Sequence, residues 1–422
     1  MTNWKEYILG DLVNINQRTV GKDFSFQTIE YIDTSSLTEN KFEKPQLLSI
    51  KDAPSRAKRL IQTGDTILST VRPIQKHYGF IKKSKSNTVV STGFVVISPK
   101  KIDPKFLYYF LTQEVITNHL NTIAESSTTT FPSFRPDEIA KLKIFAPEKI
   151  EQQTSIAEIL SSLDDKIELN NQINQNLEIL AQALFKQWFV DFEFPDKKGN
   201  PYKSSGGKMM ESELGEIPKG WKVYSMDELL ETVSKTYPLK KVKEVVFLNT
   251  GDIQDGKFLH KNFSNPENLP GQAKKSIAQN DILYSEIRPA NKRFAYVYFD
   301  ASQYVVSTKL MVMRSKVEIN SLFQYFYLTQ QESIKYLQHL AESRSGTFPQ
   351  ITFSEVSTIK IALPDFELVN TFVETALKPY YDNQFQVKDE NEKLILLRDL
   401  LLPKLISGEL EVKAVKVQLT KA

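Results

Sequence analysis

The sequence GDTILSTVRP at residues 64–73 returns as NDILYSEIRP at residues 280–289, 216 positions further along the chain. The same offset joins VVST at 89–92 to a second VVST at 305–308. Solenoid repeats are only about 20–45 residues long, so a period near 216 predicts two copies of a whole domain. A chain of 422 residues is long enough for about two to three domains.

A later phrase repeats in the same way. AESSTTTFPSF at 124–134 matches AESRSGTFPQI at 341–351 at an offset of 217, because one residue is inserted near Tyr327. In each copy, short β-branched and aromatic runs come first, then a helical stretch, the repeated phrase, a strand and a long helix. These patterns predict an α+β protein with two tandemly duplicated α/β domains, each followed by a long helix.

The two long helices carry the seam of a coiled coil. From Ile156 to Trp188, residues at alternating steps of four and three are apolar except for two asparagines, which is a heptad pattern. The equivalent seam of the second copy runs from Val373 to Leu405. We expect these seam residues to join the helices: Leu160, Leu163, Ile167, Asn174, Leu177, Leu184, Leu377, Asn391, Leu394 and Leu401.

Two polar details of this seam remain open at the level of sequence. Asn174 and Asn391 fall at equivalent seam positions, where a polar residue fixes register at a cost in stability. The alternative is that both side chains face solvent. Pro379 near the start of the second helix predicts either a kink or a late start of that helix.

Residues for catalysis, metal binding or nucleotide binding are missing from the sequence. The chain has no cysteine, and its four histidines show no metal-binding spacing, so we expect no metal site. It contains no P-loop and no GxGxxG, and NPY at 200–202 lacks one proline of the base-methyltransferase motif. The sequence therefore predicts a non-catalytic chain. It shows no signal peptide and no run of 18 apolar residues, so we expect no membrane association and a cytoplasmic location.

Basic residues gather between positions 51 and 85, where nine lysines and arginines stand against two aspartates. A local excess of this kind suits a polyanion, and hydroxyl groups on nearby loops can bond phosphates or base edges. The alternative is a solvated basic face. The candidate DNA-binding residues of the two copies are Arg56, Lys58, Arg59, Arg72, Lys76, His77, Ser127, Thr128, Thr129, Lys274, Lys275, Arg288, Lys292, Arg293, Arg344 and Ser345.

Two of these candidates have a competing interpretation. Arg72 and Arg288 each precede a proline just after a predicted strand, so each could instead be a structural arginine paired with a carboxylate. The Phe-Pro pair in each repeated phrase favours loop anchoring over base contact.

Five stretches resemble the specificity (S) subunits of Type I restriction-modification systems, and with the duplication the resemblance covers essentially the whole chain. The stretches are GDTILSTVRP, TFPSFRPDEIAKLKIFAPE, IAEILSSLDDKIELNNQINQNLEILAQALFKQWFVDFEFP, SSGGKMMESELGEIPKGW and LLRDLLLPKLISGEL. Asn280 departs from the glycine usual in the family, and Gln272 makes the second copy less basic, which puts a DNA role for Gln272 in doubt.

The resemblance implies a domain order. Target recognition domains would span 1–150 and 221–365, conserved spacer helices 151–190 and 366–408, a connector 191–220 and a C-terminal tail 409–422. The helices would form an antiparallel coiled coil that separates the two domains and sets the distance between two half-sites.

The resemblance also implies partners. They would be double-stranded DNA, two modification (methyltransferase) subunits and the restriction (ATP-dependent translocase/nuclease) subunits. S-adenosylmethionine, ATP and Mg²⁺ would lie on the partners, with no cofactor in this chain. We therefore expect a DNA reader of a bipartite, asymmetric target. The alternative is a coiled-coil adaptor without direct DNA readout.

Overall fold

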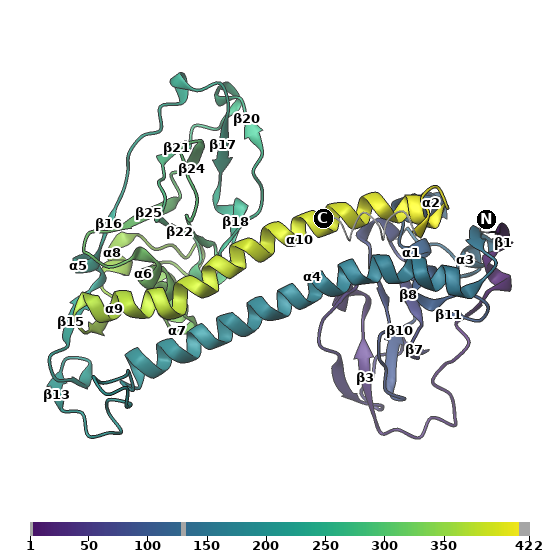
Figure 1. The fold of residues 1–422 in the computed structure, drawn as a ribbon, viewed down its shortest axis with the longest axis horizontal. Coiled ribbons are helices and arrows are strands. Elements are labelled where there is room, and N and C mark those ends of the chain that lie inside the picture. The colour runs from purple at the N-terminus through teal and green to yellow at the C-terminus, as the bar shows by residue number, and fades with distance from the viewer. Residues whose placement is uncertain (1–2, 128–131, 413–422) are drawn as a thin grey trace. The chain divides into compact units, whose positions relative to one another are not determined.

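The computed structural model describes residues 3–127 and 132–412, and the chain divides into two compact units (Figure 1). Unit 1 combines Met1–Asn171 with Lys388–Ala422, and unit 2 spans Gln172–Val387. Each unit thus holds one duplicated domain together with a part of each long helix. Unit 1 is therefore built from two separate stretches of the chain, and unit 2 from one.

The described residues of unit 1 form two four-stranded sheets and three short helices beside the long ones. One sheet has the order β6 (Gln46–Ser49), β3 (Thr28–Ile32), β10 (Thr88–Ser91) and β7 (Ala57–Leu60). The other has the order β2 (Val13–Ile15), β11 (Phe94–Pro99), β8 (Thr66–Ser69) and β9 (Tyr78–Phe80). The helices are α1 (Pro104–Leu111), α2 (Glu114–Ser127) and α3 (Asp137–Lys141), and β1 (Trp4–Ile8) pairs antiparallel with β12 (Lys143–Pro147).

Unit 2 repeats this plan strand for strand. Its sheets have the orders β20 (Phe263–Ser264), β17 (Val245–Leu248), β24 (Tyr304–Ser307), β21 (Ala273–Ser276) and β16 (Leu230–Thr232), β25 (Leu310–Ser315), β22 (Ile282–Ser285), β23 (Phe294–Tyr296). Its helices are α5 (Met226–Leu229), α6 (Ser321–Leu328), α7 (Gln331–Arg344) and α8 (Phe353–Ser357), and β15 (Lys222–Ser225) pairs with β26 (Lys360–Leu363). The predicted α+β class and the duplication are confirmed.

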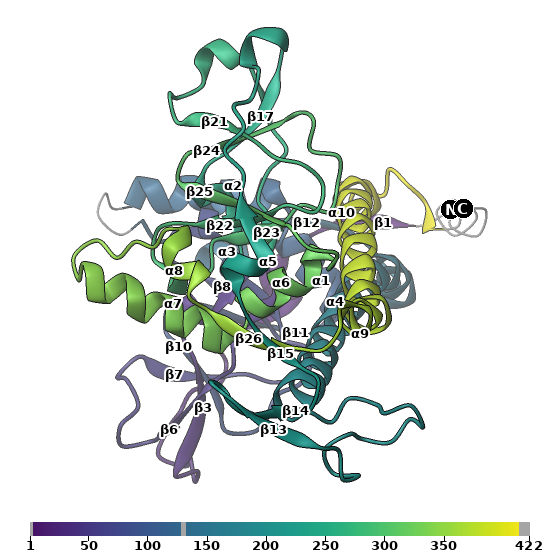
Figure 2. The same cartoon turned by 90° about the vertical axis from the view of Figure 1, so that its left-hand side faces the viewer.

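The connector adds a feature that is not part of the repeat. It forms the hairpin of β13 (Met209–Ser212) and β14 (Gly215–Pro218). In both Figure 1 and Figure 2, this hairpin and the sheet that contains β17 and β21 lie at opposite ends of unit 2.

Two long helices supply the predicted seam. Helix α4 spans Ile150–Phe185, and α9 (Phe366–Phe372) leads through a π turn into α10 (Lys378–Ile406). In unit 1, Leu160 and Leu163 of α4 share a buried core with Leu401 of α10. In unit 2, Ala181 of α4 shares a core with Leu377 and Tyr380. Within each unit, residues later in α4 contact residues earlier in the second long helix, so the two helices are antiparallel.

The asparagines of the seam face the partner helix. Asn170 is 1% exposed and donates its side-chain amide to Glu390 and to Asn391, 2.8 Å in each case. In unit 2, Asn383 donates to the side-chain oxygen of Asn174 at 3.0 Å. The solvent-facing alternative is therefore wrong. Paired polar groups of this kind specify register, because any shift would leave them without partners.

Pro379 does not delay the second helix. The helix begins at Phe366, and a π turn at Val373–Leu377 precedes the proline. Proline has no N–H for the usual bond to the carbonyl four residues earlier, and its ring crowds that carbonyl. A wider turn relieves this conflict. The predicted late start is wrong, and the irregularity is a π turn inside a continuous helix.

Arg398 ties three helices of unit 1 together. Its Nη1 donates to Asp164 at 2.8 Å, and Tyr109 of α1 donates to the same carboxylate at 2.6 Å. The side chains of Arg398 and Asp164 are only 29% and 24% exposed. The neighbouring carboxylates raise the pKa of Arg398 despite the opposing effect of burial.

Replacing Arg398 by methionine is therefore expected to destabilise unit 1 by about 2 kcal/mol, because the partly buried Asp164 carboxylate loses its ion-pair partner. The midpoint of urea unfolding measures this loss. Lys393→Met is the matched control. It removes a pair with Asp389 whose side chains are 75% and 67% exposed, and such pairs contribute at most about 1 kcal/mol. Equal shifts of the midpoint for both variants would contradict the prediction.

In each unit, residues that follow a long helix pack against an equivalent tryptophan. Trp221 packs against Phe189 and Phe194 in unit 2, with ring centroids 5.9 and 5.1 Å apart. Trp4 of unit 1 lies against Gly408 at the other end of the chain. A Cβ at Gly408 would lie 2.7 Å from Cε2 of Trp4, and its φ of +78° also favours glycine. The residues that follow each long helix therefore pack on the tryptophan that opens a domain.

Candidate nucleic-acid interface

Four loops of unit 1 are joined side by side by backbone hydrogen bonds. They are the turn before β7, the β10–β11 turn, the β8–β9 connection and the end of the first repeated phrase. The bonds run from the amide of Thr92 to the carbonyl of Arg56 (2.8 Å), from Thr70 to Gly93 (2.8 Å) and from Arg72 to Pro132 (2.9 Å). We call these four loops the loop row.

Unit 2 contains the same loop row. The bonds run from the amide of Thr308 to the carbonyl of Gln272 (2.9 Å), from Glu286 to Lys309 (3.1 Å) and from Arg288 to Pro349 (3.1 Å). The structure thus brings together segments that the sequence showed only as separate repeated phrases. The Pro132 and Pro349 carbonyls hold the arginine loops, which agrees with an anchoring role for the Phe-Pro pairs.

Arg72 and Arg288 begin their loops in an unusual backbone conformation. Their φ angles are +47° and +44°, in the left-handed region, and each is followed by a 3₁₀ turn, Pro73–Gln75 or Pro289–Asn291. A side chain at such a φ costs about 1–2 kcal/mol, and strain of this kind collects at functional sites. Both side chains are exposed.

The competing structural interpretation finds no support at these two positions. Within residues 3–127 and 132–412, no carboxylate forms an ion pair with Arg72 or Arg288. Arg288 has a weak bond from Nη2 to the Thr347 carbonyl, 3.4 Å long. The Arg288 side chain therefore leans toward the second repeated phrase.

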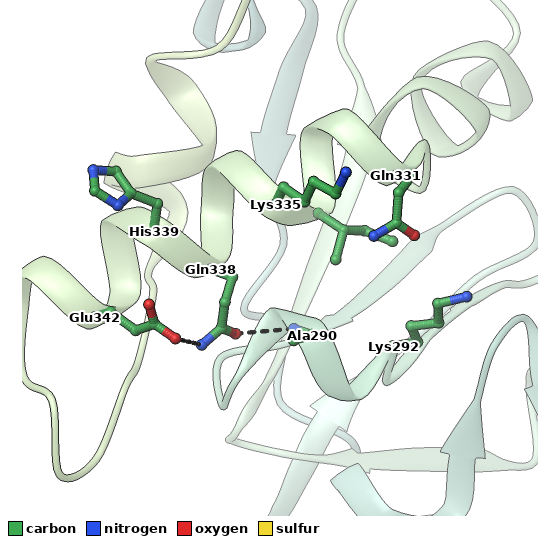
Figure 3. A pocket seen from close by; sticks show the side chains of 8 residues that line it. Ala290, Lys292, Gln331, Lys335, Gln338, His339 and Glu342 are labelled. Atoms are coloured by element: carbon green, nitrogen blue, oxygen red, sulfur yellow. Dashed lines mark hydrogen bonds between the residues drawn. The ribbon is translucent and has the colours of Figure 1, made fainter.

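Helix α7 lies beside the 3₁₀ turn that follows Arg288 (Figure 3). The amide of Ala290 donates to Oε1 of Gln338 at 3.0 Å, and Nε2 of Gln338 donates to Glu342 at 2.7 Å. Lys335 and His339 of the same helix line an open hollow beside this contact. Basic side chains therefore line this hollow together with the carboxylate of Glu342.

Several predicted residues take part in ion pairs. The pairs are Arg56–Asp33, Lys76–Glu39 (3.2 Å), Lys292–Asp255 (3.8 Å) and Arg344–Glu355 (2.6 Å). Both side chains are exposed in the two lysine pairs, and such pairs contribute about 0–1 kcal/mol each, so a phosphate could replace the carboxylate at little cost. In the two arginine pairs the carboxylates of Asp33 and Glu355 are only 14% and 16% exposed. Lys58 and Lys274 are exposed and appear in no ion pair of the described residues.

Arg59 and Lys275 have an internal role in place of the predicted exposed one. The guanidinium of Arg59 donates to the carbonyl of Phe94, and Nζ of Lys275 donates to the equivalent carbonyl of Leu310 at 2.8 Å. Burial lowers the pKa of both side chains. Arg59 and Lys275 thus link the two sheets of each domain. Alternate residues of a strand face opposite sides, so the neighbouring Lys58 and Lys274 point outward.

The remaining predicted residues differ in their placement. His77 lies on the same β8–β9 connection as Arg72, but its Nδ1 is hydrogen-bonded to the carbonyl of Leu37 at 2.5 Å. Ser127 donates to the Ala124 and Ser133 carbonyls, and Ser345 accepts a bond from the amide of Phe348 at 3.2 Å. Arg293 is half-buried beside Lys292. Thr128 and Thr129 lie outside the described residues.

Sequence reasoning did not single out the β10–β11 turn, which is the second member of the loop row. Thr92 is exposed on the β10–β11 turn, and Thr308 and Lys309 hold the equivalent place in unit 2. The signal was present, because VVST is among the phrases that recur unchanged. A hydroxyl at a turn between two basic loops can bond a phosphate or a base edge.

The described part of the chain holds no candidate metal site and no candidate membrane span. No cluster of three or more histidines, cysteines or carboxylates in it could hold a metal ion. No helix in it is long and apolar enough to span a membrane.

Comparison with known proteins gives consistent matches. The family model of the Type I restriction modification DNA specificity domain matches residues 1–179 and 218–386. The Type I restriction enzyme HindI specificity subunit of Haemophilus influenzae is 30% identical over 97% of this chain and 100% of its own length. The MjaIX specificity subunit of Methanocaldococcus jannaschii is 26% identical over 98% of this chain and 90% of its own.

A solved structure resembles the fold as well. The S subunit of a Type I restriction-modification system from M. genitalium superimposes with a TM-score of 0.59 and 14% identity, over 96% of both chains. At this identity the likeness concerns the fold alone.

Proposed function

This chain belongs to the family of Type I restriction-modification specificity subunits, which are non-catalytic and recognise the target sequence, and we propose that each of its two units reads one half of a bipartite DNA target. The two halves differ in sequence, because the loop rows differ in their side chains. Arg56 and Thr70 of unit 1 stand where unit 2 has Gln272 and Glu286.

One observation carries this proposal, and it occurs twice. An exposed arginine with a positive φ stands at the centre of each loop row, held by a proline carbonyl of the repeated phrase. Arginine can bond guanine through two N–H groups, and a fixed backbone aims the side chain. Lysines and hydroxyls on the adjacent loops would contact phosphates, which position the duplex without reading it.

The coiled coil would set the number of unread bases between the half-sites and dock two modification subunits. Ile179 in unit 2 and Leu396 in unit 1 occupy equivalent helix positions, 217 residues apart, and are 56% and 70% exposed. One exposed apolar residue at the same position of each long helix fits two copies of one partner. Restriction subunits would join this complex, and S-adenosylmethionine, ATP and Mg²⁺ would bind to the partner subunits.

The methylated sequence of a host genome tests this function. A host that expresses this chain with its modification subunit should carry methyl groups at one discontinuous, asymmetric motif with a constant gap. A continuous motif, or no new methylation from an assembled complex, would contradict the proposal.

Arg72→Gly separates DNA reading from folding. Glycine accepts a φ of +47° without strain, so the variant should be as stable as the parent or more stable by about 1 kcal/mol. Loss of an arginine at a base edge should weaken specific binding by about 1–3 kcal/mol. Thermal unfolding and DNA titration of the complex with modification subunits measure the two effects. Glu39→Gly, at a φ of +45°, is the control and should bind DNA no more weakly than the parent. Unchanged affinity of Arg72→Gly would exclude Arg72 from the interface.

A further inference from the structure

The small sheet of unit 2 carries a second basic surface that lies outside the loop row. Residues 235–243 read KTYPLKKVK and contain four lysines and no carboxylate. This segment runs beside the edge strand β21, because the amide of Tyr237 donates to the Lys274 carbonyl and the amide of Ser276 to the Lys235 carbonyl, both at 2.8 Å. We define the lysine face as Lys235, Lys240, Lys241, Lys243 and Lys274.

The packing of the segment turns these lysines outward. Tyr237 and Val245 are buried, and Leu239 and Val242 pack against the same small core. All five lysines of the lysine face are exposed. Within residues 172–387, all of which the structure describes, no carboxylate forms an ion pair with any of the five. The face therefore presents unneutralised positive charge.

The equivalent segment of unit 1 shows that the fold does not need these charges. Residues 18–26 read RTVGKDFSF, and Arg18 is paired with Asp65 at 3.4 Å. The later part of this segment holds Phe24 and Phe26, whose ring centroids are 5.3 Å apart, where unit 2 has its run of lysines. Clustered like charges repel one another, so lysines at these positions do not stabilise the domain. A polyanionic ligand accounts for them.

We propose that the lysine face binds the sugar-phosphate backbone of DNA that flanks the half-site read by unit 2. This inference rests on the proposed reading function. A lysine is a flexible point charge that suits a phosphate, and contacts to phosphates carry no base information. Because unit 1 lacks the face, the added electrostatic attraction acts on one side of the target only.

A triple substitution tests the proposal in the complex with the modification subunits. Each lysine that contacts a phosphate contributes about 0.9 to the slope of log affinity against log salt concentration. The variant Lys240→Ala, Lys241→Ala, Lys243→Ala should therefore bind with a slope shallower by about 3, and the methylated motif should be unchanged. The corresponding Lys→Gln variant removes the same charge while keeping long side chains, and it should give the same slope.

A matched control removes three exposed lysines elsewhere in unit 2. Lys197→Ala, Lys198→Ala, Lys203→Ala changes the connector that leads into the β13–β14 hairpin, at the end of unit 2 opposite the lysine face (Figures 1 and 2). Its slope should equal that of the parent.

Each other outcome has a defined meaning. An unchanged slope for the lysine-face variants, with a parent complex that binds its target, overturns the lysine face and leaves the reading function intact. A changed motif overturns it as well, because it would assign these lysines to base reading. A parent complex without salt-dependent, sequence-specific binding would contradict the reading function itself.

Discussion

Exchanging residues 1–149 for the first domain of another specificity subunit is expected to change one half of the methylated motif completely and leave the other half unchanged. The reason is that each loop row is built within one domain. The bonds of the first row join residues between Arg56 and Pro132, and those of the second join residues between Gln272 and Pro349. Genome-wide mapping of methylated bases in a host measures both halves in one experiment.

The structure sets the boundary of this exchange. A cut after residue 145 would divide β12, which pairs with β1 along its full length from Lys143 to Pro147. The donor domain should also suit Leu405 and Ile406 of α10, which are buried in the core of unit 1. The reciprocal exchange of residues 221–365 is the control and should change only the other half. A change in both halves from either exchange would contradict the independence of the domains.

Phe372→Ala should produce the largest loss of stability. Phe372 is fully buried and contacts Trp188 and Phe189, with ring centroids 5.3 and 5.0 Å apart. Removing a buried phenylalanine costs about 3–5 kcal/mol through lost burial and the cavity that remains. Urea unfolding followed by tryptophan fluorescence measures this loss in unit 2, because Trp188 and Trp221 both lie in or against this core.

The control for this variant is Phe263→Ala. Phe263 is 48% exposed on the edge strand β20, where truncation should change the free energy of unfolding by about 0.5 kcal/mol or less. If the two variants unfolded at the same urea concentration, the aromatic core would not hold unit 2 together in the way that the contacts indicate.

The sequence was informative about the site where a property belongs to one short segment. Arg72 and Arg288 stand out because each opens the same Arg-Pro loop in an internal repeat, and the structure places both on exposed loops. Neighbouring basic residues could not be sorted in this way. Lys58 and Arg59 are adjacent, yet one faces solvent and the other bonds the Phe94 carbonyl of a different sheet.

The amino-acid sequence alone determined the duplication, the α+β class, the coiled-coil seam and the resemblance to specificity subunits. These properties follow from the periodicity of apolar residues and from the repeats within the chain. Both can be recognised without knowing which distant residues are in contact. Only the tertiary structure decided which loops join into a row, which lysines stay unneutralised and that Trp4 packs on Gly408. Such contacts depend on the register between strands and helices far apart in sequence, and one chain without aligned relatives carries no direct record of that register.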